Sequence, residues 1–448
     1  MNQIFLNEDN ELFNNFLEDY FYKNLKKENN DIFNIELIIS PKCNLGCRYC
    51  YIHKYGKDLF PSEKYDETNI INNLKLILKW FKKQNFHFRL ELFSGELFAQ
   101  KIGYEVLDEI VVWLRENKDK KILKDILIPT NFTFLMSEKY TEKIEKYIEE
   151  FHLLGANLVL SASFDGKFCE TNRPYKKNLD INFNKINDID LFYDKVFSFC
   201  SKYHFGFHPM IYSKNIEKWK ENFLWFQEQF KKYNIPWNHM YLLQVRNVEW
   251  TDEQIKEFYN FIYFLYEYTN DKLDGQIINK VFKNQKIKYD FNILFQPFGN
   301  GKASSKGLGC SLQNTLTIRL SDLKVFPCHR LMYHQFEIGE YDKQFNFKTK
   351  NAPLGLTIYG VDVTRMQPFC NKCEINYLCA GQCLGSQYEV TDSLFVPIQT
   401  VCKLQYALIL AAINFFKDNN LLLDLYKNLD AIQIEQIKDI LKKEKNND

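Results

Sequence analysis

The chain has 448 residues, which gives room for two or three domains. Its 58 basic and 57 acidic residues nearly cancel, so charge does not favour binding to nucleic acid or to a membrane surface. We expect no apolar run near the ~20 residues of a membrane span, and residues 1–18 lack the pattern of a signal peptide. These features predict a cytoplasmic, reducing location, where clustered cysteines are more often metal ligands than disulfides.

From residue 33 short apolar strands alternate with amphipathic helices. Strands are predicted at 33–40, 86–93, 125–128, 158–163, 205–211 and 240–245. Helices are predicted at 66–84, 104–116, from 137 onward, and at 188–202, 216–232 and 251–268. The Ser137 hydroxyl can cap one helix, and Thr251 with Gln254 forms a capping box for another. This alternation predicts a parallel sheet covered by helices, with reactive groups at the C-terminal ends of its strands.

Three cysteines, Cys43, Cys47 and Cys50, directly follow the first predicted strand. Three thiolates cannot fill the four positions of a structural zinc site, but they can hold three corners of a [4Fe–4S] cube. The CxxxCxxC spacing, followed by an aromatic residue, resembles the signature loop of the radical S-adenosylmethionine (radical SAM) enzymes. The resemblance implies a partial (β/α)6 TIM-like barrel and an open iron that binds SAM and cleaves it to a 5′-deoxyadenosyl radical.

Small polar motifs end the next predicted strands. Ser94-Gly95-Glu96 resembles the family's Gly-Gly-Glu element, whose carboxylate holds the SAM ammonium, with Ser94 in place of the first glycine. The run at 163–166 is similar to a Ser-x-Asp-Gly element near the SAM ribose and carboxylate. Ordinary glycine turns are the alternative interpretation of both motifs. The residues that the resemblance implies for SAM binding are Tyr49, Ser94, Gly95, Glu96, Asn131, Ser163, Asp165 and Arg173.

Seven further cysteines lie between residues 310 and 402. Taken alone, their spacing would fit one or two zinc sites. Behind a radical SAM loop, however, the CxxC-x5-C-x3-C series with a later cysteine resembles the SPASM domain, which carries two auxiliary iron–sulfur clusters. The resemblance implies an outer cluster held by Cys370, Cys373, Cys379 and Cys402. It implies an inner cluster held by Cys310, Cys328 and Cys383.

The chain departs from the SPASM pattern at two places, neither of which removes one of these ligands, and from the sulfatase maturases at a third. Full-ligand members have one more cysteine shortly before Cys310, where this chain has none, so we expect one inner-cluster iron without a cysteine ligand. Leu323 replaces a glycine that usually lies five residues before Cys328. His329 stands where sulfatase maturases place an Asp base, which disfavours oxidation of a sulfatase residue.

The predicted fold is therefore α/β, with a radical SAM barrel, a small cysteine-rich α+β SPASM domain and C-terminal helices. We expect an N-terminal helical extension at 1–32, followed by the barrel at 33–270 and a linker at 271–300. The SPASM domain is expected at 301–403 and the final helices at 404–448.

The predicted function is modification of a ribosomally made peptide by a thioether or carbon–carbon cross-link. SAM and three [4Fe–4S] clusters are the implied cofactors, and a flavodoxin or ferredoxin is the implied electron donor. Only about 32 residues precede the first strand, so leader recognition is expected to need a separate protein or the chain's aromatic residues. A sulfatase-maturase-like enzyme is one alternative, and a zinc-bearing binding or scaffold protein is another.

Overall fold

The computed structural model describes residues 32–60, 69–83, 87–117, 122–181, 186, 188–283, 315–344, 346–350, 369–379 and 381–447. The chain divides into two compact units. Unit 1 consists of Met1–Ser163, Arg173–Phe205 and Ser311–Val361, and unit 2 consists of Phe164–Asn172, Gly206–Cys310 and Asp362–Asp448. The domain boundaries expected from the sequence, from the N-terminal extension to the C-terminal helices, stay a prediction.

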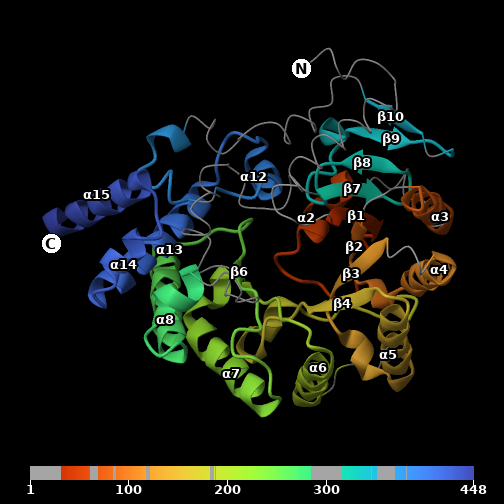
Figure 1. Ribbon diagram of the computed structural model, residues 1–448, viewed down its shortest axis with the longest axis horizontal. Helices are drawn as coiled ribbons and strands as arrows, with labels where there is room; N and C mark the ends of the chain where they lie inside the picture. Colours follow the sequence, from red (N-terminus) through yellow and green to blue (C-terminus); the bar gives the residue numbers. More distant parts are fainter. Residues whose placement is uncertain are drawn as a thin grey trace. The chain divides into compact units, whose positions relative to one another are not determined.

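An eight-stranded sheet forms the centre of unit 1, in the order β10-β9-β8-β7-β1-β2-β3-β4 (Figure 1). Its parallel half consists of β1, β2, β3 and β4, at Ile32–Ser40, His87–Ser94, Leu123–Thr130 and Asn157–Ala162. These strands confirm four of the predicted ones to within about two residues. Many apolar residues of these strands, such as Ile35, Leu90 and Ile126, are fully buried, as expected of strands covered by helices. The predicted α/β class with a central parallel sheet is confirmed.

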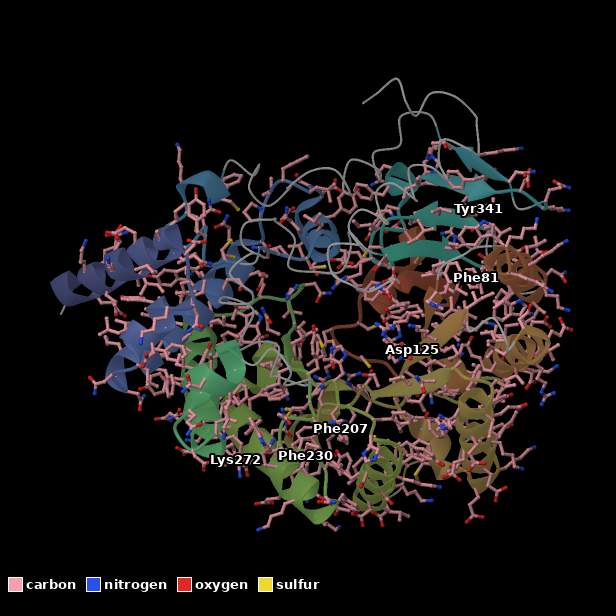
Figure 2. All side chains as sticks on the ribbon, in the orientation of Figure 1. Phe81, Asp125, Phe207, Phe230, Lys272 and Tyr341 are labelled. Carbon is pink, nitrogen blue, oxygen red and sulfur yellow. The ribbon has the colours of Figure 1, made fainter. Side chains whose placement is uncertain are left out.

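Helices α3, α4 and α5 lie along one face of this sheet (Figure 1). Phe81, labelled in Figure 2, stacks on Phe88 of β2 with the ring centroids 4.0 Å apart. Ser137 occupies the N-cap of α5, but its side chain makes no capping hydrogen bond, so that part of the prediction is wrong. Helix α2 was not predicted. The helices of unit 1 are α2 Tyr51–Leu59, α3 Asn69–Phe81, α4 Lys101–Asn117, α5 Glu138–Leu153 and α6 Ile189–Tyr203, with short 3-10 turns η1 Leu97–Ala99 and η3 Thr133–Met136.

The other half of the sheet comes from much later in the sequence. Strands β7, β8, β9 and β10 span Thr315–Arg319, Lys324–Phe326, Gly339–Tyr341 and Phe347–Thr349, with a 3-10 turn η8 at His334–Phe336. β7 pairs parallel with β1, and the remaining three strands continue antiparallel. Leu323, in the turn between β7 and β8, has a φ of 57°, the left-handed conformation that a glycine adopts easily. The turn is therefore retained although its glycine is not, at a cost of about 1–2 kcal/mol.

Unit 2 contains a two-stranded parallel sheet of β5 Met210–Ile211 and β6 Leu243–Gln244. Both strands are shorter than the predicted ones, because Phe207 and Met240 add only an isolated bridge. Buried rings back this sheet: those of Phe207 and Phe230 lie 5.1 Å apart (Figure 2). Helix α8 begins with the predicted capping box. The helical segments are η4 Lys167–Asn172, η5 Ser213–Lys218, α7 Trp219–Lys232, α8 Asp252–Lys272, a π-helical turn Ile278–Lys283, η9 Cys370–Lys372, α12 Leu384–Thr391, α13 Gln399–Asp418, α14 Leu422–Tyr426 and α15 Ala431–Asn447.

Helix α13 is long and apolar enough to cross a membrane, judged by length and composition alone. The expectation that no run of the chain approaches a membrane span is therefore wrong. The most apolar part of α13 is 61% buried inside the protein. Its Phe415 ring stacks on Tyr266 of α8 with the centroids 5.4 Å apart. Such burial is typical of a core helix in a folded domain.

Candidate functional site

The first cysteine loop lies at the C-terminal edge of the parallel sheet, directly after β1. The Cys50 N–H donates to the Cys47 carbonyl at 3.1 Å, and the Leu45 N–H donates to Cys43 Sγ at 3.4 Å. Burial raises the pKa of the Cys43 thiol, and the charges of Glu96, Cys47 and Cys50 raise it further. The three thiols and one carboxylate are therefore close enough to interact electrostatically. Backbone N–H donation to sulfur is also what cluster-bound thiolates receive, so the loop fits an iron–sulfur cluster.

The end of β2 lies against the start of this loop. The Gly95 N–H donates to the Ser40 carbonyl at 2.7 Å, and the Glu96 N–H donates to the Lys42 carbonyl at 2.9 Å. A Cβ at Gly95 would lie only 2.1 Å from the Lys42 carbonyl oxygen, so glycine is required at this position. The Ser94 hydroxyl donates to the Ser40 carbonyl at 3.0 Å. This bond explains how a serine is accommodated in place of the usual glycine.

The carboxylate of Glu96 is 2% exposed and accepts three hydrogen bonds from the protein. The donors are the Phe98 N–H at 3.3 Å, the Thr130 hydroxyl at 2.8 Å and the Asn131 N–H at 2.7 Å. Burial raises the pKa of Glu96 to about 7, although these hydrogen bonds lower it. A buried carboxylate of this kind is a suitable partner for a cationic group, because such a group would stabilise its ionised form.

The predicted ligands Asn131, Tyr49 and Arg173 all lie around the loop in unit 1. The Asn131 amide binds within the protein: it donates to Asn44 Oδ1 at 2.8 Å, and its oxygen accepts from Thr133. The Arg173 guanidinium lies 5.4 Å from the centre of the Tyr49 ring, within cation–π range. The segment after Arg173 also pairs with the loop, since the Lys176 N–H donates to the Asn44 carbonyl. Arg173 is therefore held beside the cysteines.

The fourth strand end is divided between the two units. Ser163 belongs to unit 1, where its N–H donates to the Thr130 carbonyl at 2.8 Å. Asp165 belongs to unit 2 and is 2% exposed. Its carboxylate accepts from the Met210 N–H at 3.0 Å and from the Asn172 amide at 3.4 Å. Within unit 2, Asp165 therefore links the loop after β4 to β5.

The outer set of cysteines gathers within unit 2. Burial raises the pKa of Cys379 to about 12 and that of Cys402 to about 11, and the charges of Cys370 and Cys373 contribute to both shifts. The Gly381 N–H donates to Cys379 Sγ at 3.3 Å. This mutual proximity and N–H donation fit a second iron–sulfur site. Among the described residues, no three His, Cys, Asp or Glu side chains converge closely enough to hold a single metal ion.

The proposed inner set is described only in part. Cys328 follows β8 in unit 1, where its Sγ accepts from the Arg330 N–H at 3.3 Å. Cys383 is the N-cap residue of α12 in unit 2. Cys310 lies outside the described residues, as do Ser304 and Ser305, which occupy the stretch where full-ligand SPASM members carry the additional cysteine.

A pair formed by the buried Glu36 and the partly buried His329 was not anticipated from the sequence. Glu36 of β1 accepts from the His329 backbone N–H at 3.0 Å, from its Nδ1 at 3.1 Å and from the Thr317 hydroxyl. Burial alone would raise the pKa of Glu36 and lower that of His329, but their interaction reverses both shifts. The His329 ring stacks on Phe93 with the centroids 4.1 Å apart. The sequence signal was a single carboxylate inside the apolar run of β1.

Two further residues of the site, Asn44 and Thr133, were also missed, because Asn44 occupies an unspecified position of the CxxxCxxC spacing and Thr133 belongs to no motif. Asn44 is fully buried between two of the cysteines, and its amide donates to the Thr133 hydroxyl at 2.8 Å.

No family model and no curated protein sequence matches the chain. Among solved structures, native anSMEcpe with bound AdoMet, a radical SAM/SPASM protein, superposes with a TM-score of 0.57 and 17% identity, covering 86% of this chain and 99% of that one. Native anSMEcpe with bound AdoMet and Cp18Cys peptide superposes with a TM-score of 0.53 and 17% identity, covering 86% of this chain and 99% of that one. SuiB of Streptococcus suis bound to S-adenosylmethionine superposes with a TM-score of 0.46 and 12% identity, covering 88% of this chain and 83% of that one. The likeness to anSMEcpe shows that this chain has the radical SAM/SPASM fold.

Proposed function

We propose that this chain, which has the radical SAM/SPASM fold, is a cytoplasmic enzyme that cross-links a ribosomally made peptide through a thioether or carbon–carbon bond. The observation that carries the proposal is the arrangement at one edge of the sheet. Three thiols follow β1, of which Cys43 interacts electrostatically with Cys47, with Cys50 and with the buried Glu96 carboxylate at the end of β2. A site with cluster ligands and a partner for an ammonium group fits a cluster that binds SAM.

When bound, the first cluster would supply reductive cleavage of SAM to a 5′-deoxyadenosyl radical, and the auxiliary clusters would accept the electron left after cross-linking. The chain's own residues bind and orient these groups. Cys43, Cys47 and Cys50 are the proposed ligands of the first cluster, and Glu96 the partner of the SAM ammonium. Tyr49, Ser94, Gly95, Asn131, Ser163, Asp165 and Arg173 complete the proposed SAM site.

The proposed inner set lacks one cysteine, which leaves an iron for a thiolate of the peptide and favours a thioether product. Metal coordination deprotonates a thiol and fixes its sulfur. Cross-linking removes two hydrogens from the peptide: the adenosyl radical takes a hydrogen atom from carbon, and the thiol releases a proton. A flavodoxin or ferredoxin would supply the one electron that SAM cleavage consumes, and the one electron left after cross-linking would return to such a carrier through an auxiliary cluster. A separate protein is the proposed leader-binding partner.

A sulfatase-maturase-like activity is the second candidate. The likeness to anSMEcpe, an anaerobic sulfatase maturase, favours it at the level of the fold. His329 disfavours it, because its Nδ1 is bonded to Glu36 at the position where those enzymes are expected to carry an Asp base.

The first test is anaerobic reconstitution of the full chain with iron and sulfide, followed by metal analysis and incubation with SAM and a reductant. Three cubes correspond to roughly twelve irons per chain, and 5′-deoxyadenosine should form. Stoichiometric zinc with about four irons or fewer would instead support the zinc-bearing scaffold alternative for the C-terminal cysteines.

The second test uses short peptides encoded beside the gene, compared with a cysteine peptide from a sulfatase. Loss of two hydrogens together with loss of one free thiol indicates a thioether, and loss of two hydrogens with all thiols retained indicates a carbon–carbon bond. Oxidation of the sulfatase peptide alone would replace the cross-linking proposal with the second candidate.

A further inference from the structure

The cysteine loop and Glu96 are connected by a continuous set of buried hydrogen bonds. Asn44, located between Cys43 and Cys47, donates to the Thr133 hydroxyl and accepts from the Asn131 amide, both at 2.8 Å. The Asn131 oxygen accepts from the Thr133 N–H at 3.0 Å and from its hydroxyl at 2.7 Å. The Asn131 backbone N–H then donates to Glu96 at 2.7 Å. All members are at least nine-tenths buried, so water does not compete for these bonds.

The turn that carries Asn131 and Thr133 is also conformationally constrained. Phe132, between them, has a φ of 62° and is 1% exposed. A bulky residue in the left-handed region is strained and persists only where its surroundings fix it. The Phe132 N–H donates to the Thr130 hydroxyl at 3.2 Å, and that hydroxyl donates to Glu96. The strained turn is therefore fixed by the same carboxylate.

We infer that Asn44 is a positioning residue, which sets the distance between the cysteine loop and the Glu96 carboxylate before any ligand binds. The inference rests on the proposed function, in which the loop holds the SAM-binding cluster and Glu96 meets the SAM ammonium. SAM would contact both parts at once, so a displacement of either one weakens its binding. Asn44 acts through Asn131 and Thr133 and need not touch SAM itself.

The test measures SAM affinity by equilibrium dialysis with the full chain after anaerobic reconstitution. Asn44→Ala and Thr133→Val should each weaken SAM binding about tenfold, with the iron content retained. Thr133→Ser keeps the hydroxyl and should remain within about twofold of the parent. The matched control is Asn117→Ala on α4, where a buried amide donates to the Trp113 carbonyl. It should lower thermal stability and leave SAM affinity unchanged.

A double variant separates positioning from a purely structural role. If Asn44 acts by placing Glu96, Asn44→Ala should weaken SAM binding by less than about threefold in a Glu96→Gln background. The inference is overturned if the two losses multiply, or if Asn44→Ala and Thr133→Val both bind SAM like the parent. Thr133→Val nearly preserves the shape of the side chain. If Asn44→Ala does not fold, the SAM affinity of Thr133→Val therefore tests the inference. A parent that binds no SAM overturns the proposed function as well, whereas a SAM-binding parent with unaffected variants overturns this inference alone.

Discussion

The two described cysteine regions are supported in different ways. Within the loop at 43–50, Asn44 accepts from the Asn131 amide and from the Lys176 N–H, and it donates to the Thr133 hydroxyl. Asn131 and Thr133 are buried, and the Gly46 N–H donates to the Pro174 carbonyl. The outer set relies on turns within residues 370–379, such as the Cys373 N–H to the Cys370 carbonyl, and on Cys402 of α13. Cys373 is also exposed. The first region is thus shaped by the folded sheet, whereas the second should depend on its metal to become rigid.

The largest expected effect tests whether the first region alone carries SAM cleavage. Changing Cys43, Cys47 and Cys50 together to Ala should abolish 5′-deoxyadenosine formation and leave iron in the C-terminal sites. The control is Cys200→Ala, which removes a buried thiol that belongs to neither cysteine group. This variant should retain 5′-deoxyadenosine formation. Continued deoxyadenosine formation by the triple variant under anaerobic conditions would refute the assignment of these three ligands.

Removal of iron should separate the two regions physically. After anaerobic chelation, amides at 370–379 should lose protection from hydrogen exchange, because their turns are short and partly exposed. The Gly46 and Lys176 amides, which donate to the carbonyls of Pro174 and Asn44, should stay protected. Mass spectrometry of the exchanged peptides would measure the protection of the amides in both cysteine regions. Equal loss of protection in the two regions would contradict the proposed difference.

Gly95→Ala tests how closely the sheet holds the first loop. Its Cβ would lie 2.1 Å from the Lys42 carbonyl oxygen, so the backbone must move. We expect a loss of about 2–4 kcal/mol in the free energy of unfolding, measured by denaturant titration. The matched control is Gly56→Ala in α2, where the nearest atom would be 3.7 Å away. That change should stabilise the protein by about 0.5–1 kcal/mol, and a similar loss in both variants would argue against the close approach.

The smallest expected effect concerns Glu91 of β2, which is half-buried and whose carboxylate accepts no hydrogen bond from any described residue. Burial, and secondarily the charge of Glu36, raises the pKa of Glu91 from 4.5 to about 7. The folded state therefore binds its proton more tightly, and this group should lower stability as pH rises from about 4.5 to 7. Glu91→Gln should raise the free energy of unfolding by about 1–2 kcal/mol at pH 8 and have little effect at pH 4.5. An equal change at both pH values would contradict this.

The sequence predicted much of the first unit, because local signals suffice there. Periodic apolar residues located β1 to β4 and helices α3 to α6, although not α2. In the second unit, Thr251 with Gln254 identified the start of α8. The spacing of Cys43, Cys47 and Cys50 placed the loop after β1, where the structure has it. Prediction was poorer for β5 and β6, since apolar runs do not reveal how many backbone pairs a short strand makes.

The sequence by itself determined the α/β class with its parallel sheet and the residues that could serve as cluster ligands, because hydrophobic period and cysteine spacing are local properties. The radical SAM/SPASM fold followed from the resemblance of those cysteine motifs to the family's. Only the tertiary structure placed β7 beside β1, more than 270 residues earlier in the chain, and brought Glu36 to His329 and Asn44 to Asn131. These contacts join distant segments through backbone ladders and buried polar groups. Which partners meet depends on the register of the whole sheet, and no pattern within a single segment specifies that register.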